Sequence, residues 1–255
     1  MAEGFIKFFG TGGARFVVSR QVRATGGMWI RYRETDLYVD PGPGAIVRIS
    51  SSKESFDPSR LDGIVLTHKH IDHSNDVNVI AEAMTEGGFK RRGVIFCPED
   101  ATEEDPVILR YVRSYVERIE FLKEGGQYNL KDLSFSTPLR HRHPVETYGL
   151  LFHFPKKLAL ISDSRYFEEL KSAYRAEILI VNVLRWKSPD KFDAIDHLSI
   201  EDFVEIVRDI RPEIAIMTHF GMQLIKQKPH LIAERLKRET GVNIIAAYDG
   251  MKFEF

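Results

Sequence analysis

Residues 67–73 read Thr67-His68-Lys69-His70-Ile71-Asp72-His73, which places three imidazoles and one carboxylate within six consecutive residues. The apolar run at residues 62–66 precedes them and is typical of a buried strand. Side chains that follow such a strand lie where α/β folds place their sites. Neutral imidazole and carboxylate both suit a borderline divalent metal such as zinc. The stretch therefore predicts a metal site, in which His68 and His70 face one way in an extended chain while Asp72 and His73 can serve a second ion.

The pattern H-x-H-x-D-H resembles the signature of the metallo-β-lactamase fold superfamily. Four further residues extend this resemblance in the order that the family shows, and they are Asp40, His143, Asp163 and His219. Each follows a strand-like run or precedes a glycine at the family's spacing. The glycine-rich turn at residues 10–13 and the segment 248–251 also resemble the family's first turn and closing segment. The resemblance therefore covers most of the chain.

The resemblance implies two bound divalent metal ions. Metal one would take His68, His70 and His143; metal two would take Asp72, His73 and His219; Asp163 would bridge them. Asp40 would orient the loop and a ligand rather than bind metal. His141 is a rival ligand, and only the spacing to Gly149 favours His143. This donor set suits Zn²⁺, with Mn²⁺ and Fe²⁺ as alternatives because selection also depends on geometry and metal availability.

The resemblance further implies a hydrolase that uses a metal-bridging hydroxide as its nucleophile. Asp72 and His197 are the predicted catalytic residues. In phosphodiesterases that resemble ribonuclease Z, a His placed like His197 donates a proton to the leaving oxygen or holds a phosphate. The alternative is a His at a helix entry that only hydrogen-bonds nearby backbone. Arg185 and Lys187, with Lys191 in the same loop, are predicted to bind an anionic substrate.

The substrate is predicted to be a small molecule, and the resemblance favours a cyclic or linear phosphate diester. The chain is most similar to the phosphodiesterase branch, which includes ribonuclease Z and the phosphoribosyl cyclic phosphate phosphodiesterase. Only 20 positions separate His143 from Asp163, which leaves no room for the tRNA-gripping arm of the usual bacterial ribonuclease Z. Nucleic acid remains an open partner, but tRNA processing is disfavoured. The alternatives are a carbonyl hydrolase, such as a lactonase or thioesterase, and a non-hydrolytic metal-binding protein.

The length, charge and cysteine content of the chain limit the classes of protein to which it can belong. The chain has 255 residues and a net charge of −1, so it fits one domain over residues 1–255, and nothing global argues for nucleic-acid or membrane binding. One cysteine, Cys97, excludes an internal disulfide framework, and it is expected in the core. The first residues lack the features of a signal peptide, so a cytoplasmic location is expected. A homo-oligomer is expected only by analogy with the family.

The pattern of apolar residues predicts a mixed α/β (α+β) chain. Helices are expected over residues 75–85, 106–119 and 230–238, and Ser199 resembles the start of a capping box ahead of a helix that ends before Pro212. Strands are expected over residues 5–9, 28–33, 37–40, 133–137, 149–154, 157–162 and 177–182. Periodicity alone gives no more than this, and the resemblance implies the four-layer αβ/βα sandwich of the metallo-β-lactamase fold.

Overall fold

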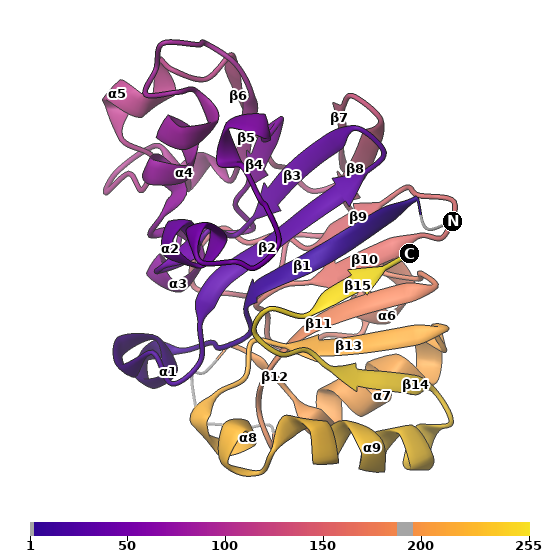
Figure 1. The fold of residues 1–255 in the computed structure, drawn as a ribbon. Coiled ribbons are helices and arrows are strands. Elements are labelled where there is room, and N and C mark those ends of the chain that lie inside the picture. The colour runs from indigo at the N-terminus through magenta and orange to yellow at the C-terminus, as the bar shows by residue number, and fades with distance from the viewer. Residues whose placement is uncertain (1–2, 188–195) are drawn as a thin grey trace.

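The computed structural model describes residues 3–187 and 196–255, which form two mixed β-sheets with helices on their outer faces (Figure 1). The first sheet has the order β15 (Lys252–Glu254), β1 (Gly4–Gly10), β2 (Thr25–Tyr32), β3 (Thr35–Val39), β4 (Gly63–Val65), β5 (Val94–Cys97) and β6 (Arg118–Phe121). Its strands are antiparallel from β15 to β3 and parallel from β3 to β6.

The second sheet repeats this division into an antiparallel and a parallel half. Its order is β14 (Asn243–Ala246), β13 (Ile214–Thr218), β11 (Ile178–Arg185), β10 (Leu158–Ile161), β9 (Leu150–Phe152), β8 (Leu133–Thr137) and β7 (Gly126–Leu130), and β12 (Leu198–Ser199) pairs with β11. The strands from β7 to β10 are antiparallel, and those from β10 to β14 are parallel. The parallel halves matter for function because their carboxyl ends lie at one edge of a sheet.

The outer layers are short helices. They are α1 (Arg15–Arg20), α2 (Ala45–Ser50), α3 (Ile71–Ser74), α4 (Val77–Met84), α5 (Arg110–Arg113), α6 (Glu169–Ala173), α7 (Ile200–Ile210), α8 (Met222–Lys226) and α9 (Pro229–Thr240), with 3-10 turns at Pro58–Arg60 and Glu99–Ala101. In the part of the chain that the structure describes, no helix is long and apolar enough to cross a membrane.

Side chains alternate between the two faces of each strand, so each sheet packs on both sides. The result is three hydrophobic cores between four layers of helices and sheets. Leu158 and Leu160 of β10 face the core between the sheets, whereas Ala159 and Ile161 face the core beneath α6, α7 and α9. A third core joins the first sheet to α2 and α4. Figure 1 shows α2 to α5 grouped beside the first sheet and α7 and α9 along the second. The predicted αβ/βα sandwich is confirmed.

Local sequence signals determine where several helices begin and end. The side chain of Ser199 accepts a hydrogen bond from the backbone N–H of Asp202, whose carboxylate accepts one from Ser199, so the predicted capping box is present. The helix that follows, α7, ends at Ile210, before Pro212. Gly241, at φ 75°, ends α9 in the left-handed conformation that favours glycine. Cys97 lies buried in β5, as predicted.

The helix predicted over residues 106–119 is wrong. The structure has only the short α5 there, and β6 begins at Arg118. Ile108, Val112 and Val116 are all buried and recur every four residues, which mimics a helix. Leu109, however, is extended, and the backbone N–H of Glu117 donates to Gly93 at the start of the pairing with β5. Tertiary pairing of β6 therefore overrides the local periodicity.

Candidate metal centre

The predicted ligands converge where the parallel strands of both sheets end. His68 follows β4 of the first sheet, whereas Asp163 follows β10 and His219 follows β13 of the second. Asp72 and His73 lie on α3, directly after the loop that carries His68. Residues far apart in the chain thus meet at one edge of the sandwich. This is the position at which open parallel sheets bind ligands.

One group of possible ligands contains three histidines. One nitrogen from each of His68, His70 and His143 lies within 4.8 Å of the others. His143 Nε2 lies 2.9 Å from His70 Nδ1, while His143 Nδ1 lies 2.9 Å from the backbone carbonyl oxygen of Asp196. That carbonyl accepts the Nδ1 proton and leaves Nε2 as the nitrogen available to an ion.

A second group surrounds the carboxylate of Asp163. Its Oδ2 lies 3.3 Å from His73 Nε2, 3.4 Å from His219 Nε2 and 3.6 Å from His68 Nε2. Asp72 Oδ2 lies 3.8 Å from the Nε2 atoms of both His73 and His219. Because Asp163 Oδ2 faces ligands from both groups, it occupies the position between them that the resemblance assigned to a bridging residue.

The side chains of these groups have the chemistry that a divalent cation requires. The Nε2 atoms of His68, His73 and His219 are buried and have no hydrogen-bond partner within residues 3–187 and 196–255. Buried polar atoms of native proteins are almost always paired, so three unpaired nitrogens aimed at one carboxylate require an explanation. A bound cation would satisfy all of them, since imidazole and carboxylate are its ordinary ligands.

Burial also keeps most of these imidazole rings in the neutral form, which is the form that binds a metal ion. Burial lowers the pKa of His70 to about 4 and that of His219 to about 4, so both rings are neutral at pH 7. His73 is the exception: burial lowers its pKa, but the carboxylates of Asp163, Asp40 and Asp72 raise it well above the ordinary value. His73 therefore favours its protonated form, which offsets part of the negative charge of these carboxylates.

Asp40 contacts the loop that carries the first possible ligands. Its Oδ1 accepts a hydrogen bond from the backbone N–H of Thr67 at 2.7 Å, and its Oδ2 lies 2.9 Å from His73 Nδ1. This contact on Nδ1 turns Nε2 toward the ligand cluster. The hydroxyl of Thr67 also donates to Asp40 and accepts from Ser162, which ties the two sheets together beneath the site.

Asn182 is a functional residue that the sequence reasoning missed. Its side-chain amide donates to Asp163 Oδ1 at 2.8 Å, which leaves Oδ2 to face the histidines. The signal was present, because Asn182 is a polar residue inside the otherwise apolar β11. A buried amide in such a strand needs a specific partner, and here that partner is a predicted ligand.

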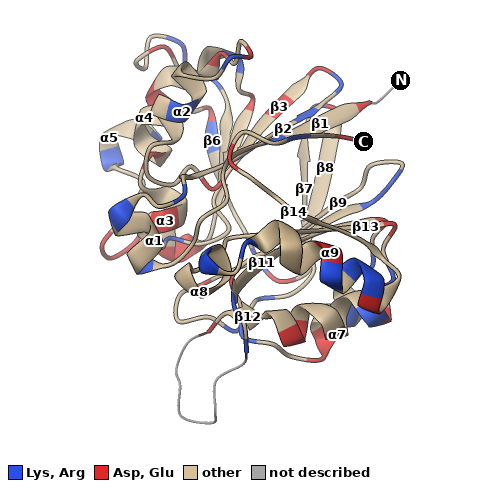
Figure 2. Cartoon of the chain, turned by 60° about the horizontal axis from the view of Figure 1, so that its bottom comes forward, with Lys and Arg blue, Asp and Glu red and all other residues tan. Residues whose placement is uncertain are grey.

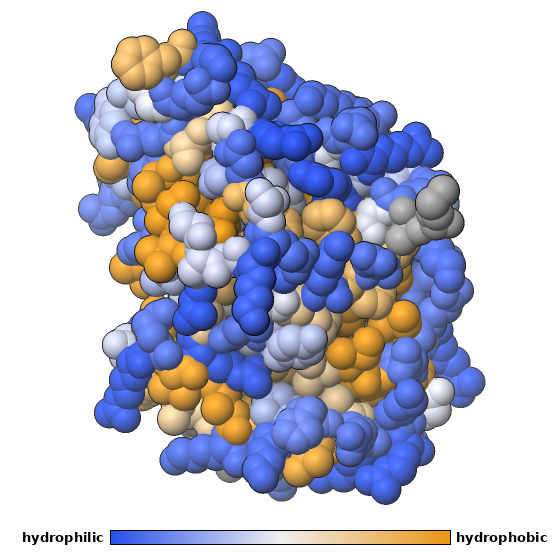
Figure 3. Space-filling view, viewed as in Figure 1, coloured by the Kyte–Doolittle hydropathy of each residue, from blue (hydrophilic) through white to orange (hydrophobic). Residues whose placement is uncertain are grey.

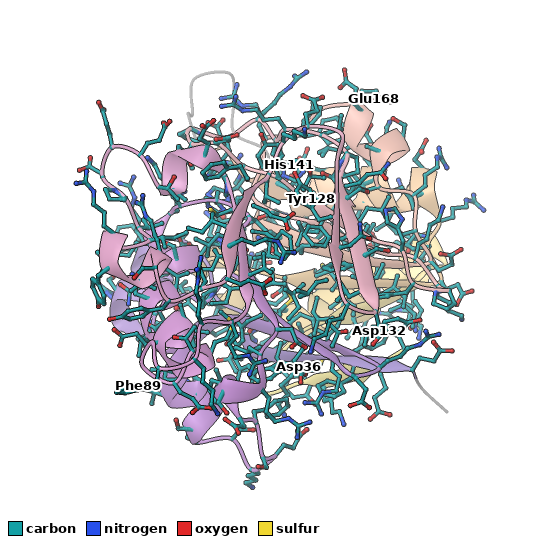
Figure 4. The ribbon with its side chains drawn as sticks, turned by 90° about the horizontal axis from the view of Figure 1, so that it is seen from above. Asp36, Phe89, Tyr128, Asp132, His141 and Glu168 are labelled. Carbon is teal, nitrogen blue, oxygen red and sulfur yellow. The ribbon has the colours of Figure 1, made fainter. Side chains whose placement is uncertain are left out.

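His141 lies apart from the ligand cluster. Its Nε2 is 2.9 Å from the hydroxyl of Tyr174, and its Nδ1 is 3.3 Å from the backbone oxygen of Asp163. The ring is buried, and Figure 4 shows His141 in the interior while Phe89 and Glu168 lie at the periphery. Of the two rival histidines, His143 is the one that the structure places among possible ligands.

His197 lies next to Asp163 and His219. Its Nδ1 is 3.5 Å from Asp163 Oδ2, and its ring is stacked against that of His219 with centroids 5.7 Å apart. Together with His143 and Asp163 it forms a third group that could hold an ion. The backbone carbonyl of His197 accepts a hydrogen bond from Arg185 at 2.8 Å. Arg185 therefore positions His197, while Lys187 is exposed nearby and Lys191 lies outside the described residues.

The glycine-rich turn supports the opposite side of the cluster. A Cβ on Gly13 would lie 2.2 Å from His219 Cδ2, so only glycine fits there. Asp249 fixes this turn by accepting hydrogen bonds from the backbone N–H groups of Thr11 at 3.0 Å and Ala24 at 2.8 Å. The predicted first turn and closing segment thus meet beside His219, a possible metal ligand. Next to the site, Figure 3 shows hydrophobic residues over α2 and α3, where Val47 and Ile71 are exposed.

Comparisons with known proteins agree with this architecture. The Beta-lactamase superfamily domain matches residues 35–220, and the chain belongs to this superfamily in its metallo-β-lactamase fold form. The uncharacterised protein MJ1374 of Methanocaldococcus jannaschii is 32% identical over 98% of this chain and 94% of its own.

Two solved structures show the same fold at low sequence identity. The metallo-β-lactamase fold protein YhfI of Bacillus subtilis has a TM-score of 0.81 and 17% identity, and the match covers 99% of each chain. A diphosphatase from the PhnP family has a TM-score of 0.73 and 20% identity, with 99% of this chain and 97% of that chain covered. Both likenesses show that this chain has the metallo-β-lactamase fold.

Proposed function

We propose that the protein is a dinuclear metal-dependent phosphodiesterase that acts on a small cyclic or linear phosphate diester. The observation that carries the proposal is the convergence of unpaired imidazole nitrogens on Asp163 Oδ2 from two groups of ligands. His68, His70 and His143 would hold one ion, and Asp72, His73 and His219 the other, with Asp163 between them. Zn²⁺ suits this donor set best.

When bound, the two ions supply Lewis acidity and a water-derived nucleophile at neutral pH. The residues of the chain supply the rest. Asp40 and Asn182 orient His73 and Asp163 through the contacts described above. His197 keeps Nδ1 toward Asp163, and its ring is 16% exposed, so Nε2 is the atom that would meet substrate. We assign to it the donation of a proton to the leaving oxygen.

Three features support a small phosphate diester over other substrates. Arg185 and Lys187 lie at the end of β11, beside His197, where they would attract an anion. The interval between His143 and Asp163 holds only β9, β10 and their turns, so no long arm for a large RNA is inserted there. One structural neighbour is a diphosphatase from the PhnP family.

The test is hydrolysis of bis(p-nitrophenyl) phosphate by metal-free, Zn²⁺-loaded and Mn²⁺-loaded protein. Metal-dependent cleavage that is lost in Asp163→Ala supports the proposal. Asp209→Ala is the matched control, because Asp209 is an exposed carboxylate that pairs with Arg175 far from the cluster. Cleavage of lactones or thioesters in place of the diester would favour a carbonyl hydrolase, and failure to bind metal would overturn the site assignment.

A further inference from the structure

A surface groove of about 770 Å³ lies at the end of β11. It is lined by the end of β11 with Trp186 and Lys187, by α8, and by Ala14. Two of its lining residues are close in sequence to the cluster of possible ligands. Ala14 follows Gly13, on which an added Cβ would lie 2.2 Å from His219 Cδ2, and Gly221 follows two residues after His219. Its volume lies within the range of small-molecule sites. Groups of a substrate beyond the scissile bond could therefore reach it.

The side chains of the groove share one chemical character. Its cations are Arg185, Lys187 and Lys226, and among the described residues that line it there is no carboxylate. Figure 2 shows this basic character at the end of β11 and on α8, in contrast to the mixed charges of α7 and α9. Side-chain amides of Gln223 and Gln227 add hydrogen-bond donors and acceptors. The surface thus suits an anionic ligand that also contains a ring with hydrogen-bond donors and acceptors at its edge.

Trp186 gives the groove an aromatic wall that is held in place. The guanidinium of Arg235 lies 4.7 Å from the centre of its ring, and the ring packs against the core beneath α7 and α9. Ala14, which also lines the groove, has φ 66° and ψ 158°, a conformation that residues other than glycine rarely adopt. Such strain persists where the surroundings hold it, often at ligand sites. An ordered aromatic ring between cations is the arrangement that binds nucleotide bases and their phosphates.

We propose that this groove, which we call the α8 groove, binds the nucleoside part of a nucleotide substrate. The base would stack on Trp186, and Lys187 and Lys226 would contact phosphate or ribose oxygens. The inference rests on the proposed phosphodiesterase activity of the adjacent centre, and it narrows the substrate from any small diester to one that contains a nucleotide. Binding can be measured without turnover, so the two proposals can fail separately.

Intrinsic fluorescence offers a direct readout, because the chain contains two tryptophans. Trp29 is fully buried and donates to Asp36 at 2.6 Å, so a surface ligand cannot reach it. Metal-loaded protein would be titrated with adenosine monophosphate and with ribose 5-phosphate, and binding would be followed by fluorescence and by calorimetry. The phosphate is common to both probes, so any difference reports the base.

We expect adenosine monophosphate to quench the fluorescence and to bind about tenfold more tightly than ribose 5-phosphate, since stacking on an aromatic ring contributes a factor of this order. Trp186→Leu should remove the difference, and Trp186→Phe should restore it by calorimetry without the fluorescence change. Lys226→Gln should weaken nucleotide binding, whereas Lys90→Gln, at an exposed ion pair with Glu86, should not. Circular dichroism would confirm that each variant is folded.

Equal affinity for the two probes, unchanged in Trp186→Phe and Lys226→Gln, would overturn the proposal even if the enzyme cleaves simple diesters. Conversely, base-dependent binding that needs Trp186 and Lys226 would support the α8 groove even if bis(p-nitrophenyl) phosphate is not hydrolysed. In that case the phosphodiesterase proposal fails and the nucleotide site remains. A dinucleotide used as a third probe distinguishes a mononucleotide ligand from the end of a longer strand by the extra affinity of the second residue.

Discussion

Two histidines that lie two positions apart should respond to alanine substitution in different ways. His143 presents Nε2 to the cluster of possible ligands, and its Nδ1 is held by the carbonyl of Asp196. His141 points its Nε2 at the hydroxyl of Tyr174 instead. We therefore expect His143→Ala to reduce the metal content from about two ions per chain to about one, and His141→Ala to leave it unchanged.

The magnitudes follow from what each ring touches. In His141→Ala the buried hydroxyl of Tyr174 loses the ring as its partner, which costs about 1–3 kcal/mol. The cavity left by the ring adds to this, so we expect a total loss of about 2–5 kcal/mol in the free energy of unfolding. A typical domain has about 5–15 kcal/mol, so the variant should fold at 25 °C with a lower denaturation midpoint. His143→Ala, at a partly exposed position, should cost less stability but more metal.

The assay is metal content by mass spectrometry after dialysis against buffered Zn²⁺, combined with urea denaturation of the same samples. Tyr174→Phe is a useful companion, since it removes the hydroxyl and leaves His141 in place; it should cost about 1–3 kcal/mol and retain both ions. The reasoning is refuted if His141→Ala loses an ion while His143→Ala keeps two, because the ligand would then be the histidine that the structure places outside the cluster.

Four further results are expected. Metal affinity should rise about tenfold per pH unit near neutrality, because His73 has a raised pKa and must release its proton to bind an ion; calorimetry in buffers of different ionisation enthalpy measures that proton. Gly13→Ala should displace His219 and lower metal occupancy, as read by metal analysis. Asn182→Ala should lower metal affinity about 10–100-fold by freeing Asp163, as read by competition with a chelator. Zn²⁺ at about 100 times its Kd should stabilise the metal-free protein by about 2.7 kcal/mol in thermal unfolding.

Matched controls and opposite outcomes make these predictions specific. Gly44→Ala, where nothing lies within 4 Å of the new Cβ, should lose only about 1 kcal/mol of stability from its positive φ and no metal. Asn129→Ala, at an exposed position of β7, should leave metal affinity unchanged. A pH-independent affinity would contradict the proton assigned to His73. Full occupancy in Gly13→Ala, or a melting temperature indifferent to Zn²⁺, would contradict the packing of the turn or the cation site.

The candidate ligands at strand ends could be predicted from the sequence because the same pattern precedes each of them. Asp40, His68, Asp163 and His219 each follow a run of apolar residues, and each such run forms a strand that is buried on both faces. A polar residue at the end of such a run must find a partner at the edge of the sheet. The family resemblance supplied the assignment of partners, which no local pattern contains.

What the sequence could not supply depends on contacts across the fold. The choice between His141 and His143 is decided by Tyr174, which lies 33 positions from His141 and binds it in space. The failed helix over residues 106–119 has the same origin, since pairing of β6 with β5 determines its conformation. Asn182 carried a visible signal, but its meaning depends on the neighbouring strand β10, which ends just before Asp163.

The two halves of the sandwich contribute unequal parts of the site, and this division has a physical consequence. Asp72 and His73 come from the first sheet's side, whereas Asp163 and His219 come from the second. Before the sheets pack, no segment holds a complete second group of ligands, so tight binding at that position depends on the folded sandwich. An ion there would in turn oppose separation of the sheets, together with the buried chain of hydroxyls from Ser162 through Thr67 to Asp40. Because the candidate ligands lie at strand ends, the strands can be buried and rigid while His70, Asp72 and His197 at the edge of the sandwich are partly exposed.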